Sequence, residues 1–178
     1  MGADPRLGDG GTVLVPPAPP MPFDLALADL LAPERIGVCL RTAGKADAIA
    51  RLVALISGAE AVVDVARLGA DVRAREAQMS TGVGEGLALP HARTPAVTAT
   101  VAAFATLDPA VGFDALDGKP VRLAFLLAGP EADRGRHLRL LSRVSRLMSA
   151  PALRERLYAA SAPGEVLEAI RDAEAALV

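Results

Sequence analysis

The amino-acid sequence predicts an α/β fold in which a mixed β-sheet is flanked by α-helices in a single compact domain. Segments with apolar residues at helical spacing are interspersed with short apolar segments typical of strands. Helix, strand, helix, strand, strand and helix follow one another along the chain, a mixture that favours an α/β sandwich with a mixed sheet. With 178 residues, 52% of them hydrophobic and only 3% aromatic, the chain can bury one large aliphatic core.

One strand and two long helices are predicted in the first half of the domain. A short helix is expected over 23–31, and alternating apolar side chains predict a strand over 36–40. Apolar residues then recur on one helical face over 44–57, and Gly58 is a plausible stop. The second long helix is expected over 60–78.

Three strands and three helices are predicted in the second half. A glycine-rich loop over 82–86 precedes them, and Asp117-Gly118 predicts a turn before the third strand. The strands are expected over 87–89, 98–106 and 121–128. The helices are expected over 133–149, 151–160 and from 163 onward. Proline at 151 and 163 suits the first turn of a helix.

Residues 1–22 are expected to lie outside the domain, which comprises residues 23–178. Glycine and then proline cluster in this N-terminal segment, which contains too little apolar surface to form a core. Such a composition predicts an extended, solvated tail.

Composition argues against several classes of function. The net charge of −2 is unlike the basic excess of nucleic-acid-binding proteins. No apolar run reaches the roughly 18–20 residues that span a bilayer, so no membrane insertion is expected. With no export signal and a single cysteine, a cytoplasmic protein is expected. That cysteine, Cys39, is predicted to be a small buried side chain in the strand over 36–40.

No metal or other cofactor is expected. The glycine spacing over 82–86 differs from a dinucleotide fingerprint, and an apolar strand rather than a helix follows it. The two histidines, His91 and His137, are far apart in sequence and lack the His-Glu-x-x-His spacing of zinc hydrolases.

His91 is the most informative residue of the chain. It follows the glycine-rich loop, a short apolar run and Pro90, which restricts the backbone just before it. An imidazole has an ordinary pKa of about 6.5, so its neutral, nucleophilic form is available at neutral pH to carry a phosphoryl group. Phosphoryl transfer then requires mainly positioning and charge stabilisation. From the residues alone, a histidine that merely caps a strand is the alternative.

His137 is predicted to face inward. On a helical wheel it shares the apolar side of the helix over 133–149. It is therefore either a core histidine or a second imidazole that gives a hydrogen bond to a phosphoryl group on His91. Four arginines share the opposite side, which predicts a solvated face. They are Arg136, Arg139, Arg143 and Arg146.

Arg75 is a candidate ligand for the phosphoryl oxygens. It lies near the end of the helix over 60–78, just before the glycine-rich loop. A guanidinium there can bind phosphoryl oxygens through paired hydrogen bonds. The alternative is an ion pair with Asp71, one turn earlier; Asp64 and Arg67 are also spaced to pair.

The segment from Ser80 to Ala92, STGVGEGLALPHA, closely resembles the phosphorylation signature of the type-2 EIIA domains of the bacterial sugar phosphotransferase system. This fructose/mannitol class includes the nitrogen-regulatory EIIA proteins. The resemblance extends over most of residues 23–178. Further segments resemble the family in the family's order: 75–76, 113–121, 125–131 and 137–147.

The resemblance implies a phosphotransferase with a phosphohistidine intermediate. His91 would accept a phosphoryl group from phospho-HPr and pass it to a sugar-specific, fructose-type EIIB domain. Arg75 and His137 would bind that group, supplying positive charge and hydrogen-bond donors, while Thr81 and Glu85 would be supporting residues. HPr and EIIB are expected to dock in turn on one apolar surface around His91.

The resemblance also implies a second function of a different class. In the nitrogen-regulatory members, phosphorylation of the same histidine would control binding to target proteins, without sugar transport. The sequence contains no EIIB or membrane EIIC segment that would connect it to a sugar. Transfer to a purified EIIB domain distinguishes the two functions.

Overall fold

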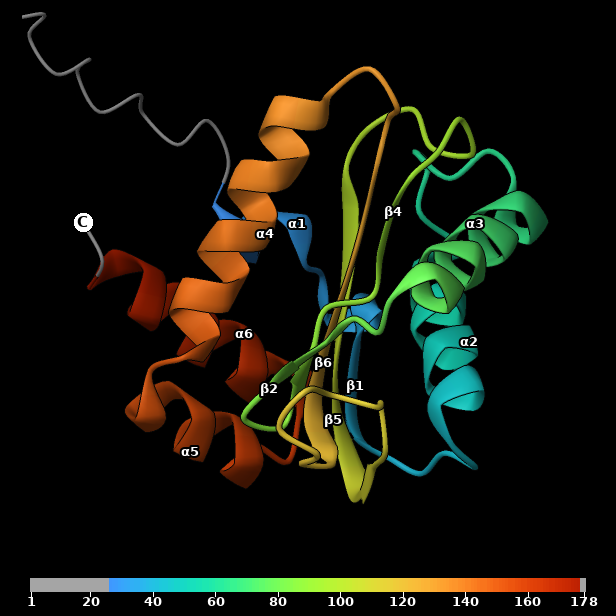
Figure 1. Ribbon diagram of the computed structural model, residues 1–178. Helices are drawn as coiled ribbons and strands as arrows, with labels where there is room; N and C mark the ends of the chain where they lie inside the picture. Colours follow the sequence, from blue (N-terminus) through green and yellow to red (C-terminus); the bar gives the residue numbers. More distant parts are fainter. Residues whose placement is uncertain (1–25, 177–178) are drawn as a thin grey trace, which may run out of the picture.

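The computed structural model describes residues 26–176, which form one mixed sheet with helices on both faces (Figure 1). The predicted α/β class is confirmed. The predicted tail, 1–22, lies outside the described residues, as does the start of the helix expected over 23–31. Within the described part, that helix is the four-residue α1, Leu27–Leu30. A short 3₁₀ turn, η1, follows over Pro33–Arg35.

The sheet is mixed because its strands run in both directions. β1 is parallel to β5, and β5 is antiparallel to β6. β3 and β4 both run parallel to β6, and β2 is antiparallel to β3. The spatial order is β1-β5-β6-β3-β2, with β4 also paired to β6. The strands are β1 Ile36–Leu40, β2 Gly82–Gly84, β3 Leu87–Ala88, β4 His91–Arg93, β5 Val101–Val111 and β6 Val121–Gly129.

Two groups of helices cover the two faces of the sheet (Figure 1). Helices α2 and α3 pack on one face, and α1, α4, α5 and α6 pack on the other. Side chains of β6 alternate between the two cores: Phe125 faces the α4 side, edge to face with Phe104, and Leu126 faces the α2 side. The helices are α2 Lys45–Ile56, α3 Val65–Gln78, α4 Arg134–Met148, α5 Pro151–Ala159 and α6 Pro163–Ala175. In the described part of the chain, each helix is too short or too polar to cross a bilayer.

Several predicted boundaries were wrong. Helix α3 begins at Val65 rather than at 60, because the side chain of Asp64 caps the helix by accepting the N–H of Arg67 at 2.8 Å. The predicted loop over 82–86 contains β2, followed by a turn in which Glu85 and Gly86 have positive φ angles of 52° and 72°. Strand β5 starts at Val101 and extends beyond the predicted end at 106.

Cys39 is exposed, contrary to the prediction. Its φ angle of 51° lies in the left-handed region, and the register of β1 against β5 shifts between Gly37 and Leu40. The irregularity breaks the alternation of side chains on which the prediction rested. The backbone N–H of Cys39 donates to Oγ1 of Thr106 at 2.7 Å, which holds this conformation.

The arginine-rich face of α4 is predicted to be solvated, and for Arg143 this prediction is wrong. The side chain of Arg143 is 11% exposed and forms an ion pair with Glu174 of α6 at 3.0 Å. Glu174 also accepts the N–H groups of Leu27 and Ala28, at 2.8 and 2.9 Å. One buried carboxylate therefore joins α1 and α6 to α4, the helix that carries His137.

Candidate active site

His91 is the first residue of β4, at the edge of the sheet where α3 and α4 approach it. Its backbone is in register with Leu127 of β6, and the N–H of Leu127 donates to the carbonyl of Pro90 at 3.0 Å. The sequence had predicted a strand ending before His91. Instead β3 and β4 continue along the same side of β6, with Leu89 and Pro90 between them.

One of the two nitrogens of the His91 imidazole forms a hydrogen bond to the backbone. Nδ1 lies 2.8 Å from the carbonyl oxygen of Leu89. Because a carbonyl only accepts hydrogen bonds, Nδ1 carries the proton and Nε2 keeps its lone pair. Burial is the main cause of a lowered His91 pKa; Arg75 also lowers it, while the bond to Leu89 and the charge of Glu76 raise it. The ring is therefore neutral and nucleophilic at neutral pH.

His137 stands opposite His91, on the first turn of α4. The ring centroids are 5.7 Å apart, with planes inclined by 50°. His137 is only 4% exposed, which confirms that it faces inward. Gly129 makes room for it, since a Cβ on this glycine would lie 3.1 Å from Nδ1 of His137. The absence of that side chain lets the imidazole approach the sheet and His91.

Neither nitrogen of His137 has a hydrogen-bond partner among the described residues. Burial, followed by the charges of His91 and Arg93, lowers the pKa of His137 from 6.5 to about 4. In the unphosphorylated protein His137 therefore offers a neutral N–H donor at neutral pH, and the positive charge expected of it stays a prediction. A buried donor without an acceptor costs about 1–3 kcal/mol, so this placement is unfavourable for folding alone.

The two histidines line a cavity of about 530 Å³ between α3, β4 and the start of α4. Its charged residues are Arg67, Arg75, Arg93, Arg134, Asp71 and Glu131. Guanidinium groups thus outnumber carboxylates, and such a cavity suits an anion with several oxygens. Among the residues that the structure describes, no cluster of three or more His, Cys, Asp or Glu could hold a metal ion.

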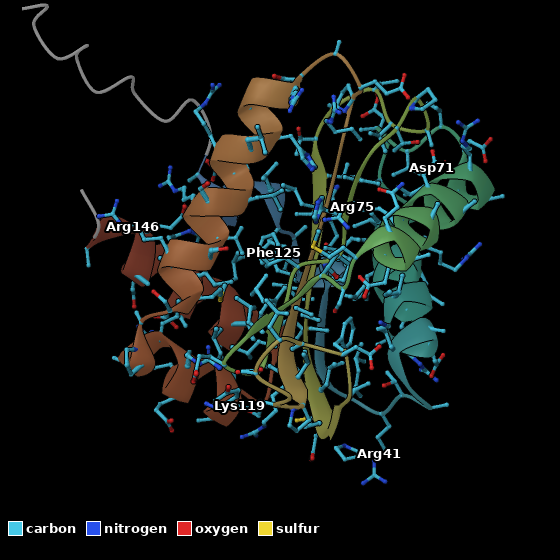
Figure 2. All side chains as sticks on the ribbon, in the orientation of Figure 1. Arg41, Asp71, Arg75, Lys119, Phe125 and Arg146 are labelled. Carbon is cyan, nitrogen blue, oxygen red and sulfur yellow. The ribbon has the colours of Figure 1, made fainter. Side chains whose placement is uncertain are left out.

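Arg75 extends from the last turn of α3, and Figure 2 places it between this helix and the strands. Its Nη1 donates to the carbonyl of Met79 at 3.0 Å. The predicted alternative, an ion pair with Asp71, does not form: Asp71 binds Nε of Arg67 at 2.9 Å and the hydroxyl of Thr94 at 2.6 Å. The charge of Arg75 therefore remains available to a ligand in the cavity.

The structure does not bring the two predicted supporting residues into this cavity. Thr81 is buried behind it and gives its N–H and hydroxyl to the carboxylate of Glu76. Glu85 is on the β2–β3 turn, where its carboxylate binds Nζ of Lys119 at 2.9 Å. It lines a different cavity, between this turn and the start of α5.

Sequence reasoning missed two arginines of the cavity, Arg93 and Arg134. Arg93 is two residues after His91 on β4, and side chains at that spacing point to the same face of a strand. Its Nη1 donates to the carbonyl of Glu131 at 3.0 Å. The extended character of 91–93 was the signal that could have identified it.

The site combines a nucleophilic imidazole, a facing imidazole with unpaired nitrogens and a cavity rich in guanidinium groups. On an α/β domain, this combination defines the class of a phosphoryl-transfer component. Residues 29–173 match the family model described as "Phosphoenolpyruvate-dependent sugar phosphotransferase system, EIIA 2". The chain belongs to this family, whose members are phosphoryl-transfer components of that system.

Relatives of two kinds are similar to the chain. A nitrogen regulatory protein of Pseudomonas aeruginosa is 31% identical over 150 residues, which are 84% of this chain and 97% of that protein. The fructose-specific EIIABC component of Bacillus subtilis is 31% identical over 146 residues, which are 82% of this chain but only 23% of that protein. The crystal structure of the nitrogen regulatory protein IIA-Ntr from Neisseria meningitidis superposes with a TM-score of 0.75 at 34% identity, covering 80% and 97% of the two chains.

Proposed function

We propose that this protein accepts a phosphoryl group from phospho-HPr on Nε2 of His91 and passes it to a sugar-specific EIIB domain. The Bacillus subtilis relative favours an EIIB of the fructose type. The observation that carries this proposal is the 2.8 Å contact between Nδ1 of His91 and the carbonyl of Leu89, which reserves the lone pair of Nε2 for the attack. Membership of the EIIA family supports the same chemistry.

The proposed step is an in-line displacement. The lone pair of Nε2 of His91 forms a bond to phosphorus while the bond from phosphorus to the donor nitrogen of HPr breaks, and the leaving imidazole keeps those electrons. The proton on Nδ1 stays in its hydrogen bond to Leu89. Arg75 binds the phosphoryl oxygens and His137 donates an N–H to them, so that both stabilise the charge of the transition state. In transfer to EIIB, a nucleophile of EIIB forms the new bond to phosphorus while the bond from phosphorus to Nε2 of His91 breaks and its electrons return to the imidazole.

A partner must reach Nε2 from outside the protein. Leu138, 52% exposed on α4, lines the cavity beside the imidazoles, and Met79, 69% exposed, follows α3. These apolar side chains and the arginines of the cavity offer one surface on which HPr and EIIB would dock in turn. The protein is proposed to work in the cytoplasm, where its phosphoryl donor is expected.

The test is transfer of the phosphoryl group to a purified EIIB domain. The protein is labelled with phosphoenolpyruvate, enzyme I and HPr, freed of them, and mixed with EIIB domains of the fructose and mannitol types. We expect the label to move to at least one EIIB within seconds, since a relay must release what it accepts. Labelled protein that retains its phosphoryl group with every EIIB contradicts the transport function.

Similarity to nitrogen regulatory proteins at the same identity favours a second function. In it, phosphorylation of His91 controls binding to a target protein, and no sugar receives the group. The labelled and unlabelled forms are then used in parallel pull-downs. A target retained by one form only, together with no transfer to EIIB, favours regulation over transport.

The rate of phosphoryl uptake should depend on pH through His91. The attacking form is the neutral imidazole, and the protein lowers the pKa of His91 below its ordinary value of 6.5. We therefore expect a rate that is constant from pH 8 to about 6.5 and declines only at more acid pH, as the ring takes up a proton. Initial rates with phospho-HPr, compared with a ¹⁵N titration of His91, check this. A decline already complete at pH 7 contradicts the assignment.

A further inference from the structure

Glu76 is a charged residue with no role in the proposed reaction as described above. It belongs to α3 and is only 7% exposed. Its carboxylate binds Nζ of Lys45 at 3.1 Å, the N–H of Thr81 at 3.0 Å, and the hydroxyl of Thr81. Burying a charge is costly, and these three donors offset that cost. An ion pair that only joins α2 to α3 would need neither contact with Thr81.

Hydrogen bonds continue from Thr81 to the imidazole of His91. The carbonyl of Thr81 accepts the N–H of Leu89 at 2.9 Å. The carbonyl of Leu89 in turn accepts Nδ1–H of His91 at 2.8 Å. Each acceptor is a backbone group held by the previous bond, so the position of the Leu89 carbonyl depends on how Glu76 fixes Thr81. This carbonyl selects the tautomer of His91.

The charge of Glu76 also matters for the reaction. When the neutral ring of His91 attacks through Nε2 while Nδ1 keeps its proton, positive charge develops on the imidazole. A nearby carboxylate stabilises that charge, whereas the guanidinium of Arg75 opposes it. Arg75 lowers the pKa of His91 and Glu76 raises it, as expected of a guanidinium and a carboxylate near the ring. A carboxylate behind a hydrogen-bonded imidazole is a recurrent arrangement in nucleophilic catalysis.

We infer that Glu76 is a positioning residue for His91: through Thr81 and Leu89 it holds the imidazole in the tautomer that frees Nε2, and its charge stabilises the ring during the attack. This inference rests on the proposed function only for its consequence on the rate. The tautomer of His91 is a property of the unphosphorylated protein.

The test compares Glu76→Gln with Asp114→Asn. Both variants remove a carboxylate that binds Lys45, but Asp114 binds Nζ of Lys45 at 2.8 Å, whereas the N–H and hydroxyl of Thr81 bind Glu76. ¹⁵N spectra of histidine-labelled protein give the tautomer and the pKa of His91 without any phosphoryl donor. Glu76→Gln is expected to lower that pKa further, to populate the Nε2–H tautomer, and to slow uptake from phospho-HPr about tenfold or more. Asp114→Asn should match wild type in all three.

A folded Glu76→Gln protein with the wild-type tautomer, pKa and rate overturns the inference. If Glu76→Gln does not fold, Thr81→Val and Thr81→Ser replace it, because only serine retains the hydroxyl that binds Glu76. Valine should then alter the tautomer and serine should not; equal behaviour overturns the inference. Failure of the proposed function looks different: wild type takes up no phosphoryl group, while the ¹⁵N spectra still respond to Glu76→Gln.

Discussion

His91→Ala is expected to lower the rate of phosphoryl uptake by at least about 1,000-fold, since removal of an attacking group leaves no other nucleophile in place. In wild type the label is expected to be stable in base and labile in acid, as is typical of a phosphorus–nitrogen bond. The protein is incubated with phosphoenolpyruvate, enzyme I and HPr, and the label is followed by intact-protein mass spectrometry at neutral pH.

His137→Leu is the matched control, because His137 is the only other histidine of the chain. This variant should still take up one phosphoryl group, more slowly, on His91. Thermal unfolding of His91→Ala verifies that the fold is retained. A label that persists in folded His91→Ala contradicts the assignment of the site.

His137→Leu is also expected to separate stability from function. Leucine has a similar volume and no polar atom, so it removes the two buried nitrogens that lack partners. We expect the free energy of unfolding to rise by about 1 kcal/mol. Loss of one donor to the transition state should slow phosphoryl transfer about 100-fold. Denaturant unfolding and initial transfer rates measure the two effects.

The gain in stability should depend on pH in a defined direction. The folded protein holds the pKa of His137 at about 4, whereas the unfolded chain has the ordinary value of 6.5. Between these values the unfolded state binds more protons, so wild type loses stability as the pH falls from 6.5 toward 4. The advantage of His137→Leu should grow across that interval. If the variant is less stable than wild type across this pH interval and its transfer rate is unchanged, His137 contributes only to packing.

The fold was largely predictable because burial imposes regular patterns on the sequence. Residues 123–128 of β6 form a continuous apolar run, since helices cover both faces of that strand, and α4 shows an apolar side that includes His137. The same periodicity correctly predicted that this imidazole faces inward. His91 was recognised from the composition around it and from the signature.

Other features depend on local geometry that periodicity does not contain. Cys39 turns outward because of one left-handed residue and a register shift in β1. Asp71 binds Arg67 and Thr94 rather than Arg75. Arg67 and Arg75 lie at the same helical spacing from Asp71, so the bond to Thr94, which is distant in sequence, helps to decide between them. The neutral state of His137 follows from burial and from neighbouring charges, which only the folded arrangement defines.

The most direct measurement is the position of the phosphoryl group on the imidazole. Protein labelled with ¹⁵N-histidine and phosphorylated through HPr is studied by ³¹P and ¹⁵N NMR, in which coupling identifies the nitrogen bonded to phosphorus. The contact of Nδ1 with Leu89 predicts phosphorus on Nε2 of His91, with the proton retained on Nδ1. Phosphorus on Nδ1 of His91, or on His137, would contradict the central claim.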